Sequence, residues 1–422
     1  PSSGNIQGAV DKANDGDVIP ISSGFLGEEV TISGKKIKFQ ISFLVIGNSD
    51  KNIKVSSDAE LEIDIQEGGQ LVVSSLSSVI IENAGKVIIS GEGNISAMPE
   101  GSVAVENHGD MILEKGIKIS KPQNNELPIM GNTSNITAEG TYLKETTSSW
   151  EVASIFNQSA SLDAQVALNI YAAYNYKEGD VVKAVFSSDI FAEEIVKEAE
   201  GEPDATYGYK FSVGVPAKNM GNSINVKLLV NDIEICETTT SIKEYGEKIA
   251  SGTDKNADIA KAMLHYGAKA QEYFGVEGNK IDENITFDKP GVSITSNFEM
   301  PEGTSEISYY GSSLILMDKI ILRHYFKLDD QNVENYVFTV DGEEVIPTHY
   351  AENSKYYYID IKNISADKLG DVYTIIVKKV DDKVIEFNYG AYDYVYRALN
   401  DDDAKLVALC KAVYYYGCAV SE

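Results

Sequence analysis

The sequence predicts a multidomain protein in which an all-β parallel β-helix is followed by two homologous α+β domains, each a β-sandwich or sheet packed by a helical hairpin. Three observations lead to this prediction. Residues 259–267 recur as residues 409–417, residues 81–89 recur as residues 105–113, and all 25 tyrosines lie at or after Tyr142. The first repeat indicates a duplicated domain, the second a stack of similar coils, and the tyrosine distribution a boundary between the two parts.

Residues 1–135 contain short apolar or alternating runs that Gly and Asn separate. Strands this short, repeating every ~20 to 25 residues, are typical of a parallel β-helix, where each coil buries its apolar face only when the next coil stacks on it. We expect about five coils. The clearest runs are 61–65, 70–73, 79–81, 86–89 and 111–113.

The entry segment places Ile6, Ala9, Val10 and Ala13 on one helical face before a Gly-Asp turn at 16–17. A short amphipathic helix here would cover the open end of the stack, which otherwise exposes a strand edge. These residues resemble the N-terminal cap of the pectate-lyase-like right-handed β-helix family. The resemblance implies a right-handed coil, but the fold serves both enzymes and passive stalks and so does not decide the activity.

Uronate lyases of that family use a calcium-binding carboxylate cluster and a basic residue, usually arginine. This chain has no arginine before Arg323, and His108, its one partial echo of a hydrolase motif, aligns in the repeat with an ordinary turn. Asp15 and Asp17 are weak calcium candidates, because such a cluster at a helix end more often forms a turn and a cap. We therefore expect no catalytic residue, no cofactor and no metal site beyond these two candidates.

The two later domains, residues 136–278 and 279–422, each begin with strand-like runs and end with two helices. In the first domain we expect strands at 168–171, 181–186, 207–213 and 224–230, a hairpin turn at 231–232, and helical spacing over 242–249 and 259–274. In the second domain helical spacing recurs over 392–399 and 406–416. Each domain is thus predicted to be an antiparallel sheet or sandwich that a helical hairpin covers.

An Arg-His-Tyr-Phe strand at 323–326 and a helix of sequence Lys-Ala-Met-Leu-His-Tyr-Gly-Ala at 261–268 stand out, together with segments 310–314 and 357–361. These segments resemble a tandem module common in large secreted and cell-wall proteins of gut anaerobes of the Firmicutes type. The resemblance covers about residues 136–422 and implies a surface-protein accessory module. It carries over no catalytic residue.

On a strand, Arg323 and Tyr325 share one face while His324 lies on the other, so these groups do not converge on one site. We expect a structural role for His324 and an acidic partner for Arg323. The tyrosine excess is the better functional indication, because consecutive tyrosines cannot all face one core, and exposed tyrosines beside Asp and Asn suit sugar-binding and protein-binding surfaces. The predicted ligand-binding residues are Tyr356, Tyr357, Tyr358, Tyr414, Tyr415 and Tyr416.

The composition excludes some partners. Lys and Arg number 36 against 65 Asp and Glu, a net charge of -29 that repels nucleic acid and an anionic membrane surface. No apolar run approaches the ~18 to 20 residues that cross a bilayer. The start without Met or an apolar leader is expected of a mature or trimmed fragment. Few arginines and three cysteines (Cys236, Cys410 and Cys418, expected as small buried hydrophobes) favour a secreted protein of a low-GC bacterium.

These observations together predict a non-catalytic, secreted bacterial cell-surface protein that acts as an adhesin or glycan-binding protein. Its expected partner is a glycan or a host or bacterial surface protein. Two alternatives stay open: a polysaccharide lyase or glycoside hydrolase acting on uronate-containing glycans through the β-helix, and a structural spacer that projects another domain.

Overall fold

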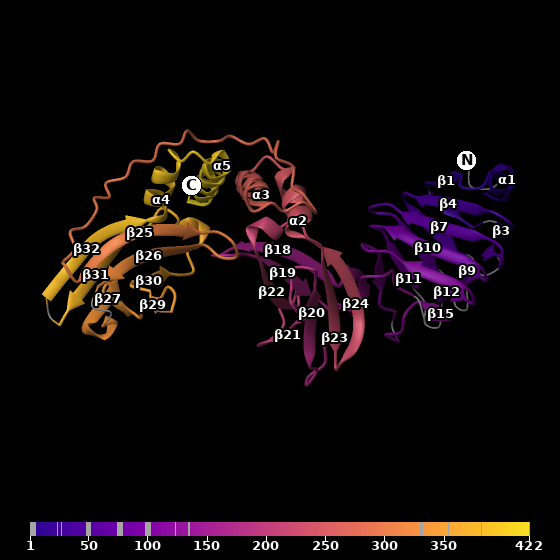
Figure 1. Ribbon diagram of the computed structural model, residues 1–422. Helices are drawn as coiled ribbons and strands as arrows, with labels where there is room; N and C mark the ends of the chain where they lie inside the picture. The colour runs from indigo at the N-terminus through magenta and orange to yellow at the C-terminus, as the bar shows by residue number, and fades with distance from the viewer. Residues whose placement is uncertain are drawn as a thin grey trace.

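The computed structural model shows three parts that follow one another along the chain: a β-solenoid and then two regions of antiparallel sheets and helices (Figure 1). No helix among the described residues is long and apolar enough to span a membrane. The described residues are 6–22, 24–26, 28–47, 52–73, 79–97, 103–122, 124–133, 136–329, 332–352, 354–380 and 382–421.

Three sheets build the solenoid, and each contains five parallel strands. About four turns therefore separate the first strand of a sheet from its last. The sequence had predicted about five coils. The first sheet consists of β1 (Val18–Ile21), β4 (Lys36–Ile41), β7 (Glu60–Ile65), β10 (Lys86–Gly91) and β13 (Asp110–Leu113). The second contains β2 (Gly24–Phe25), β5 (Leu44–Gly47), β8 (Gln70–Val73), β11 (Asn94–Ala97) and β14 (Lys118–Ser120). The third consists of β3 (Val30–Ile32), β6 (Ile53–Val55), β9 (Val79–Asn83), β12 (Val103–Asn107) and β15 (Ile129–Gly131).

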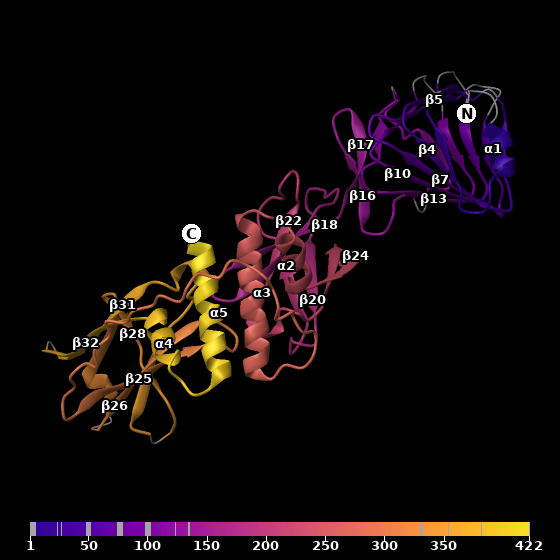
Figure 2. The ribbon, with the colours of Figure 1, turned by 90° about the horizontal axis from the view of Figure 1, so that it is seen from above.

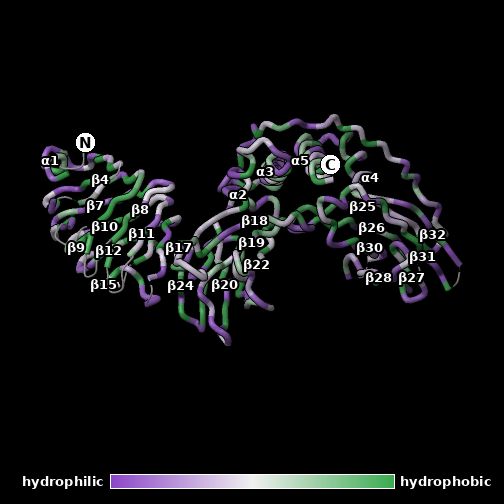
Figure 3. The backbone as a smooth tube through the Cα atoms, turned by 180° about the vertical axis from the view of Figure 1, so that it is seen from behind, coloured by the Kyte–Doolittle hydropathy of each residue, from purple (hydrophilic) through white to green (hydrophobic). Residues whose placement is uncertain are grey.

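The repeat found in the sequence is the stacking register of the solenoid. Ile81 pairs with Val105 and Val87 pairs with Met111 on the next turn. The apolar residue at alternate positions points inward, and these inward side chains form one continuous core, mostly of Ile, Val and Leu. Figure 3 shows the hydrophobic stretches that alternate along the solenoid strands.

Both copies of this repeat contain the pattern Asn-x-Gly, at 83–85 and at 107–109, and the structure explains both residue types. The buried Asn83 donates a hydrogen bond from Nδ2 to Oδ1 of Asn107 on the next turn at 2.6 Å, so two polar side chains satisfy each other inside the stack. A Cβ atom at Gly109 would lie 2.0 Å from the carbonyl oxygen of Gly85, and one at Gly85 would lie 2.2 Å from that of Ser56. Only glycine lets successive turns approach this closely.

The helix α1 (Ile6–Lys12) covers the N-terminal end of the solenoid and buries Val10 against its core. At the other end, β16 (Thr141–Glu145) and β17 (Ser149–Ser154) form a hairpin that continues the second sheet by antiparallel pairing of β17 with β14. The boundary expected after residue 135 lies outside the described residues, and the hairpin that follows it still belongs to the solenoid sheet.

The first sheet-and-helix region places two antiparallel sheets on a common core. One sheet has the order β18-β19-β22 and the other the order β21-β20-β23-β24. Asn231 and Asp232 form the predicted β23–β24 turn with φ of 53° and 63°. The elements are β18 (Phe156–Leu162), β19 (Val166–Ala172), β20 (Val182–Ser187), β21 (Ile195–Glu198), β22 (Tyr209–Val215), the 3₁₀ helix η1 (Ala217–Asn219), β23 (Ile224–Val230), β24 (Ile233–Thr240), α2 (Ile242–Ala250) and α3 (Lys255–Phe274).

The second region has sheets of order β25-β26-β30-β29 and β28-β27-β31-β32. The segment 275–306 leads to it without helix or strand and passes over α3 and α5 (Figure 1). The elements are β25 (Ile307–Ile315), β26 (Ile321–Leu328), η2 (Val333–Asn335), β27 (Tyr336–Val340), β28 (Glu343–Val345), β29 (Thr348–His349), β30 (Tyr356–Ile361), η3 (Ala366–Lys368), β31 (Val372–Lys379), β32 (Asp382–Gly390), α4 (Ala391–Ala398) and α5 (Ala404–Ser421).

The helices α3 and α5 lie side by side and join the two regions (Figure 2). Tyr266 of α3 and Tyr416 of α5 stack face to face, with ring centroids 5.5 Å apart and an interplanar angle of 20°. Both rings are almost completely buried, and burial raises the pKa of each hydroxyl above its usual value. The two regions therefore share one apolar core through this helix pair.

Candidate functional site

Four tyrosines line a pocket of about 290 Å³ on the outer face of the sheet β25-β26-β30-β29: Tyr310, Tyr325, Tyr350 and Tyr356. Tyr310 and Tyr350 are 64% and 59% exposed, a large exposure for aromatic rings. The rings meet edge to face, with centroids 4.8 Å apart for Tyr310–Tyr356 and 5.9 Å apart for Tyr325–Tyr350. We refer to these four residues as the tyrosine platform.

Local backbone features bring the platform together. Tyr325 and Tyr356 lie at outward positions of β26 and β30, as the alternation of a strand requires. A β-bulge between Tyr309 and Gly311 makes Tyr310 an extra residue, so Tyr310 is exposed while Tyr309 stays buried. The backbone N–H of Tyr350 donates to the carbonyl oxygen of Tyr356 at 2.9 Å, which ties the loop before β30 to the sheet.

An ion pair fixes the sheet face beside the platform. The Arg323 guanidinium donates two hydrogen bonds to Asp360, at 2.6 Å and 2.9 Å, and lies 3.7 Å from the centre of the Tyr358 ring. The hydrogen bond to Asp360 raises the pKa of Arg323 further above its usual range. The two hydrogen bonds and the stacking hold Arg323 in one orientation. The hydroxyl of the neighbouring Tyr325 accepts a hydrogen bond from Ser313 at 3.0 Å. Both contacts fix the sheet face next to the platform before any ligand binds.

Charged groups flank the platform at its other edge. The Asp329 carboxylate accepts a hydrogen bond from Lys355 at 2.9 Å and lies 3.5 Å from the Lys327 ammonium group, and the hydrogen bond from Lys355 lowers the pKa of Asp329. Lys327 pairs in register with Tyr356, so these polar groups lie next to the aromatic rings.

The arrangement offers large apolar contact from rigid rings together with hydroxyls, ammonium groups and a carboxylate that form hydrogen bonds. Tyrosine provides such contact at a small loss of conformational entropy, because only two side-chain dihedral angles need to be fixed. The chemistry of the site suits non-covalent recognition of a flat, hydroxyl-bearing ligand.

The strand tyrosines predicted to bind ligand divide between the two faces of β30. Tyr356 lines the platform, and Tyr358 lies on the same face under Arg323. Tyr357 lies on the opposite face, is 8% exposed, and stacks on His349 at a centroid distance of 4.5 Å.

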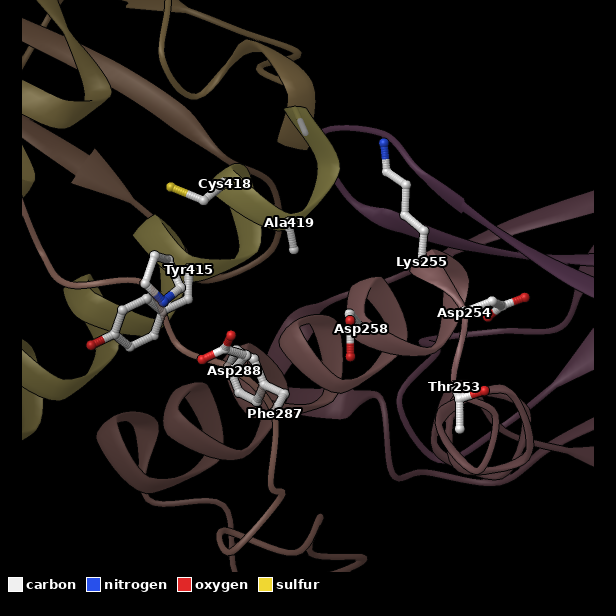
Figure 4. A pocket seen from close by; sticks show the side chains of 10 residues that line it. Thr253, Asp254, Lys255, Asp258, Phe287, Asp288, Tyr415, Cys418 and Ala419 are labelled. Carbon is white, nitrogen blue, oxygen red and sulfur yellow. The ribbon is translucent and has the colours of Figure 1, made fainter.

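The helix tyrosines lie elsewhere. Tyr416 is buried against Tyr266, and the ring of Tyr414 packs at 5.2 Å on that of Tyr392. Tyr415 lines a separate pocket of about 400 Å³ between the start of α3, the end of α5 and the segment after α3 (Figure 4). The structure thus does not bring the six predicted tyrosines into one site.

The pocket beside Tyr415 contains acidic groups, but structural contacts occupy two of them. Asp254 caps α3 by accepting a hydrogen bond from the N–H of Ala257 at 3.0 Å, and Asp258 pairs with Lys261 at 3.3 Å. In Figure 4, Asp288 comes from the segment opposite α3 and lies below Tyr415. Within the described part of the chain, no three His, Cys, Asp or Glu side chains are grouped as metal ligands.

The calcium candidates of the solenoid act in turns. The Asp17 carboxylate accepts a hydrogen bond from the N–H of Asn14 at 2.8 Å, and that of Asp15 accepts one from the N–H of Lys36 at 2.6 Å. Each carboxylate thereby satisfies a backbone donor next to the end of α1 or at the start of β4.

The partial hydrolase motif lies on the surface of the solenoid. His108 occupies an exposed turn, and its Nε2 lies 2.9 Å from Oε1 of Glu106. Glu106 pairs in register with Glu82 on the preceding turn, and both line a shallow groove of about 380 Å³ with Lys54.

The conspicuous Arg-His-Tyr-Phe strand is structural on its inner side. His324 is fully buried, its Nδ1 lies 2.6 Å from Oγ of Ser312, and burial lowers its pKa to about 3. As predicted, Arg323 and Tyr325 share the outer face and Arg323 pairs with an acidic residue. Of the cysteines, Cys236 and Cys410 are buried as expected, whereas Cys418 is only half-buried beside Tyr415.

Three of the four platform residues were not among the predicted ligand-binding residues: Tyr310, Tyr325 and Tyr350. The alternation of β26 already placed Tyr325 beside Arg323 and could have identified it. Tyr310 depends on a bulge and Tyr350 on a loop, and neither leaves a periodic signal in the sequence.

No protein-family model matches the chain, and no curated protein matches it. The geometry of these sites is therefore the basis for inferring a function.

Proposed function

We propose that this protein is a non-catalytic glycan-binding protein of a bacterial cell surface, and that the tyrosine platform is its binding site. The observation that carries the proposal is the exposed cluster of four tyrosine rings on a rigid sheet face, with charged and hydroxyl groups at its edges. Isolated exposed aromatic residues are ordinary, but several that line one pocket indicate a binding surface.

Single substitutions of the exposed rings test the proposal. Tyr310→Ala and Tyr350→Ala remove rings that are 64% and 59% exposed, so the fold should persist. Each should lower the affinity for a bound glycan about five- to tenfold, as loss of an anchor residue worth about 1 kcal/mol or more predicts. A glycan array identifies the ligand, and isothermal titration calorimetry then measures the variants.

The matched control is Tyr207→Ala, which removes a tyrosine that is 51% exposed in the first region, away from the platform. If glycan binding is unchanged in both platform variants, or is equally weakened by Tyr207→Ala, the platform is not the site. If the array shows binding to residues 6–133 alone, the function lies in the solenoid.

We further propose that the sheet-and-helix regions within residues 136–278 and 279–422 are two copies of one module, of the tandem type seen in secreted surface proteins, behind a right-handed, pectate-lyase-like β-helix. The topology supports this, because the sheet orders β21-β20-β23-β24 and β28-β27-β31-β32 follow the same path, and each region ends in two helices.

Packing of the repeated helices supports the duplication as well. A Cβ at Gly267 would lie 3.0 Å from Sδ of Met220 next to η1, and one at Gly417 would lie 3.1 Å from Cβ of Leu369 next to η3. Met220 and Leu369 occupy equivalent places in two similar segments, Val-Pro-Ala-Lys-Asn-Met-Gly at 215–221 and Ile-Ser-Ala-Asp-Lys-Leu-Gly at 364–370. Experimental coordinates in which α3 and α5 meet unrelated surroundings would contradict the duplication.

An extracellular or cell-surface location belongs to the same proposal. An acidic chain with three free cysteines and a glycan-binding face is consistent with it. Fractionation of the producing cells, with antibody detection of the chain at the surface, is the direct measurement.

A further inference from the structure

A polar cavity lies where the solenoid meets the first sheet-and-helix region. Its volume is about 500 Å³, and its lining comes from the solenoid, from the edge strands β18 and β24, and from α2. Figure 2 shows β18 and β24 on the side of the first region that faces the solenoid hairpin β16–β17. We refer to this space as the junction cavity.

The junction is built as a fixed contact. Tyr142 and Ile155 are buried in the core of the first region, although Tyr142 belongs to the solenoid hairpin. The side-chain amide of Asn175 donates to the carbonyl oxygen of Leu143 at 2.8 Å, and Lys144 donates to that of Ala205 at 3.0 Å. The solenoid and the first region, whose elements line the cavity, are therefore held together by apolar burial and by hydrogen bonds.

Two lysines line the cavity, one from the solenoid and one from α2. Lys115 lies in the turn between β13 and β14, and Lys248 lies in the last turn of α2. The turn that contains Lys115 is attached to the solenoid hairpin, because the N–H of Gly116 donates to the carbonyl oxygen of Val152. Neither ammonium group has a carboxylate within ion-pair distance among the described residues, whereas many other lysines of the chain do. In a chain of net charge -29, two unpaired lysines against one lining carboxylate, that of Glu244, leave this cavity with a local excess of positive charge.

The rest of the lining offers hydrogen bonds and apolar contact. The hydroxyl of Thr240 donates to Oε1 of Gln158 at 2.6 Å, which leaves the amide nitrogen of Gln158 without an acceptor in the described part of the chain. Glu244 supplies one carboxylate acceptor. The remaining polar and apolar groups are Asn157, Thr238, Thr239, Phe156, Tyr245, Ile170 and Ile249.

We propose that the junction cavity binds an acidic oligosaccharide, with its carboxylate or sulfate held by Lys115 and Lys248 and its hydroxyls held by the threonine and amide groups. Charge-assisted hydrogen bonds from two lysines suit one anionic group, and the neighbouring neutral donors and acceptors suit sugar hydroxyls. This site is separate from the tyrosine platform, and neither depends on the other.

Isothermal titration calorimetry of the whole chain tests the proposal with four probes. A hyaluronan tetrasaccharide carries carboxylates, a chondroitin sulfate tetrasaccharide carries sulfates as well, lacto-N-tetraose is a neutral tetrasaccharide, and inorganic sulfate is a bare anion. The acidic saccharides should bind at least about tenfold more tightly than the neutral one and than inorganic sulfate, and their affinity should fall with added salt.

Lys115→Gln and Lys248→Gln should each weaken acidic-saccharide binding about fivefold while leaving the thermal unfolding temperature unchanged, because both side chains are exposed. The matched control, Lys197→Gln, removes an exposed lysine of β21 outside the cavity and should leave binding unchanged. The titrations are repeated in the Tyr310→Ala background, where the platform is impaired, so that binding at the junction cavity is measured apart from binding at the platform.

Four outcomes overturn the proposal. They are the absence of binding by both acidic tetrasaccharides at millimolar concentration, equal binding of the neutral tetrasaccharide in the Tyr310→Ala background, equal binding of inorganic sulfate, and equal loss of affinity in Lys197→Gln. The difference in affinity between the hyaluronan and the chondroitin sulfate tetrasaccharides shows whether the lysines prefer a carboxylate or a sulfate group.

Discussion

The buried His324 makes the stability of the second region depend on pH. Its ring is fully buried among Tyr309, Phe387 and Tyr389, its Nδ1 contacts Ser312, and its Nε2 has no hydrogen-bond partner among the described residues. Arg397 donates a hydrogen bond to the carbonyl oxygen of Ser312, the residue whose hydroxyl contacts the His324 ring. Burial therefore disfavours the charged form and lowers the pKa to about 3.

The sign and size of the effect follow from linkage. In the unfolded chain the histidine pKa is ~6.5, so the folded value is depressed and the folded state opposes protonation. The contribution of His324 is fully present above pH ~6.5 and is lost as pH falls from ~6.5 towards ~3. Between pH ~7.5 and pH ~5 the loss amounts to about 2 kcal/mol for this one residue.

Urea unfolding at these two pH values measures the loss. All tyrosines lie at or after Tyr142, so near-ultraviolet circular dichroism of tyrosine reports mainly on the two sheet-and-helix regions. The variant His324→Phe keeps an aromatic ring and cannot take up a proton, so its stability should fall between the two pH values by about 2 kcal/mol less than that of the parent chain.

A second buried histidine provides an internal comparison. The pKa of His265 is lowered to about 4, mainly by burial and to a smaller extent by the charges of Lys289 and Lys269. The variant His265→Phe should therefore also reduce the pH dependence of the unfolding free energy. If His324→Phe unfolds with the same pH dependence as the parent chain, the linkage argument for this residue is wrong.

Three further predictions concern stability and catalysis. Gly417→Ala should lower the unfolding free energy of the second region by about 1 to 3 kcal/mol, because its Cβ would lie 2.4 Å from the hydroxyl of Tyr392 on α4. The control Gly278→Ala should have little effect, because no atom lies within 4 Å of the added Cβ. Asn107→Ala should lower the thermal unfolding temperature of the solenoid, because it leaves the hydrogen-bonding groups of the buried stack unpaired. Incubation with polygalacturonate or alginate, with or without calcium, should give no unsaturated product and no new reducing ends; turnover that disappears in Asp15→Ala or His108→Ala would instead support the enzyme alternative.

The sequence predicted the solenoid better than any other part. Residues 81–89 recur in the sequence as residues 105–113, and in the structure Glu82 pairs with Glu106 and Ile88 pairs with Ile112. The reason is that stacked coils of equal length place equivalent positions above each other. The hairpin β16–β17 was not predicted to continue the solenoid, since recruitment of a hairpin to an existing sheet depends on non-local pairing that leaves no local pattern.

Prediction of the site was less complete. Alternation correctly separated Arg323 and Tyr325 from His324, yet the three consecutive tyrosines of β30 were assigned to the site without distinguishing the faces. A strand must turn every second side chain to the other face, so Tyr357 could not share a surface with Tyr356 and Tyr358. The junction cavity could not be predicted at all, because its lining depends on how the solenoid and the first region meet.

The tyrosines of this chain serve two physical roles that composition alone does not separate. Tyr266 and Tyr416 are buried where two helices cross, and there the ring fills the interface while its hydroxyl loses contact with water. Tyr310 and Tyr350 present most of their surface to solvent and gain no comparable burial from folding. Burial explains why the first pair stabilises the fold, but it offers no reason for the second pair to be gathered on one sheet face. A cluster of rings that gains little burial on folding supports the proposal that these rings make their main contact when a ligand binds.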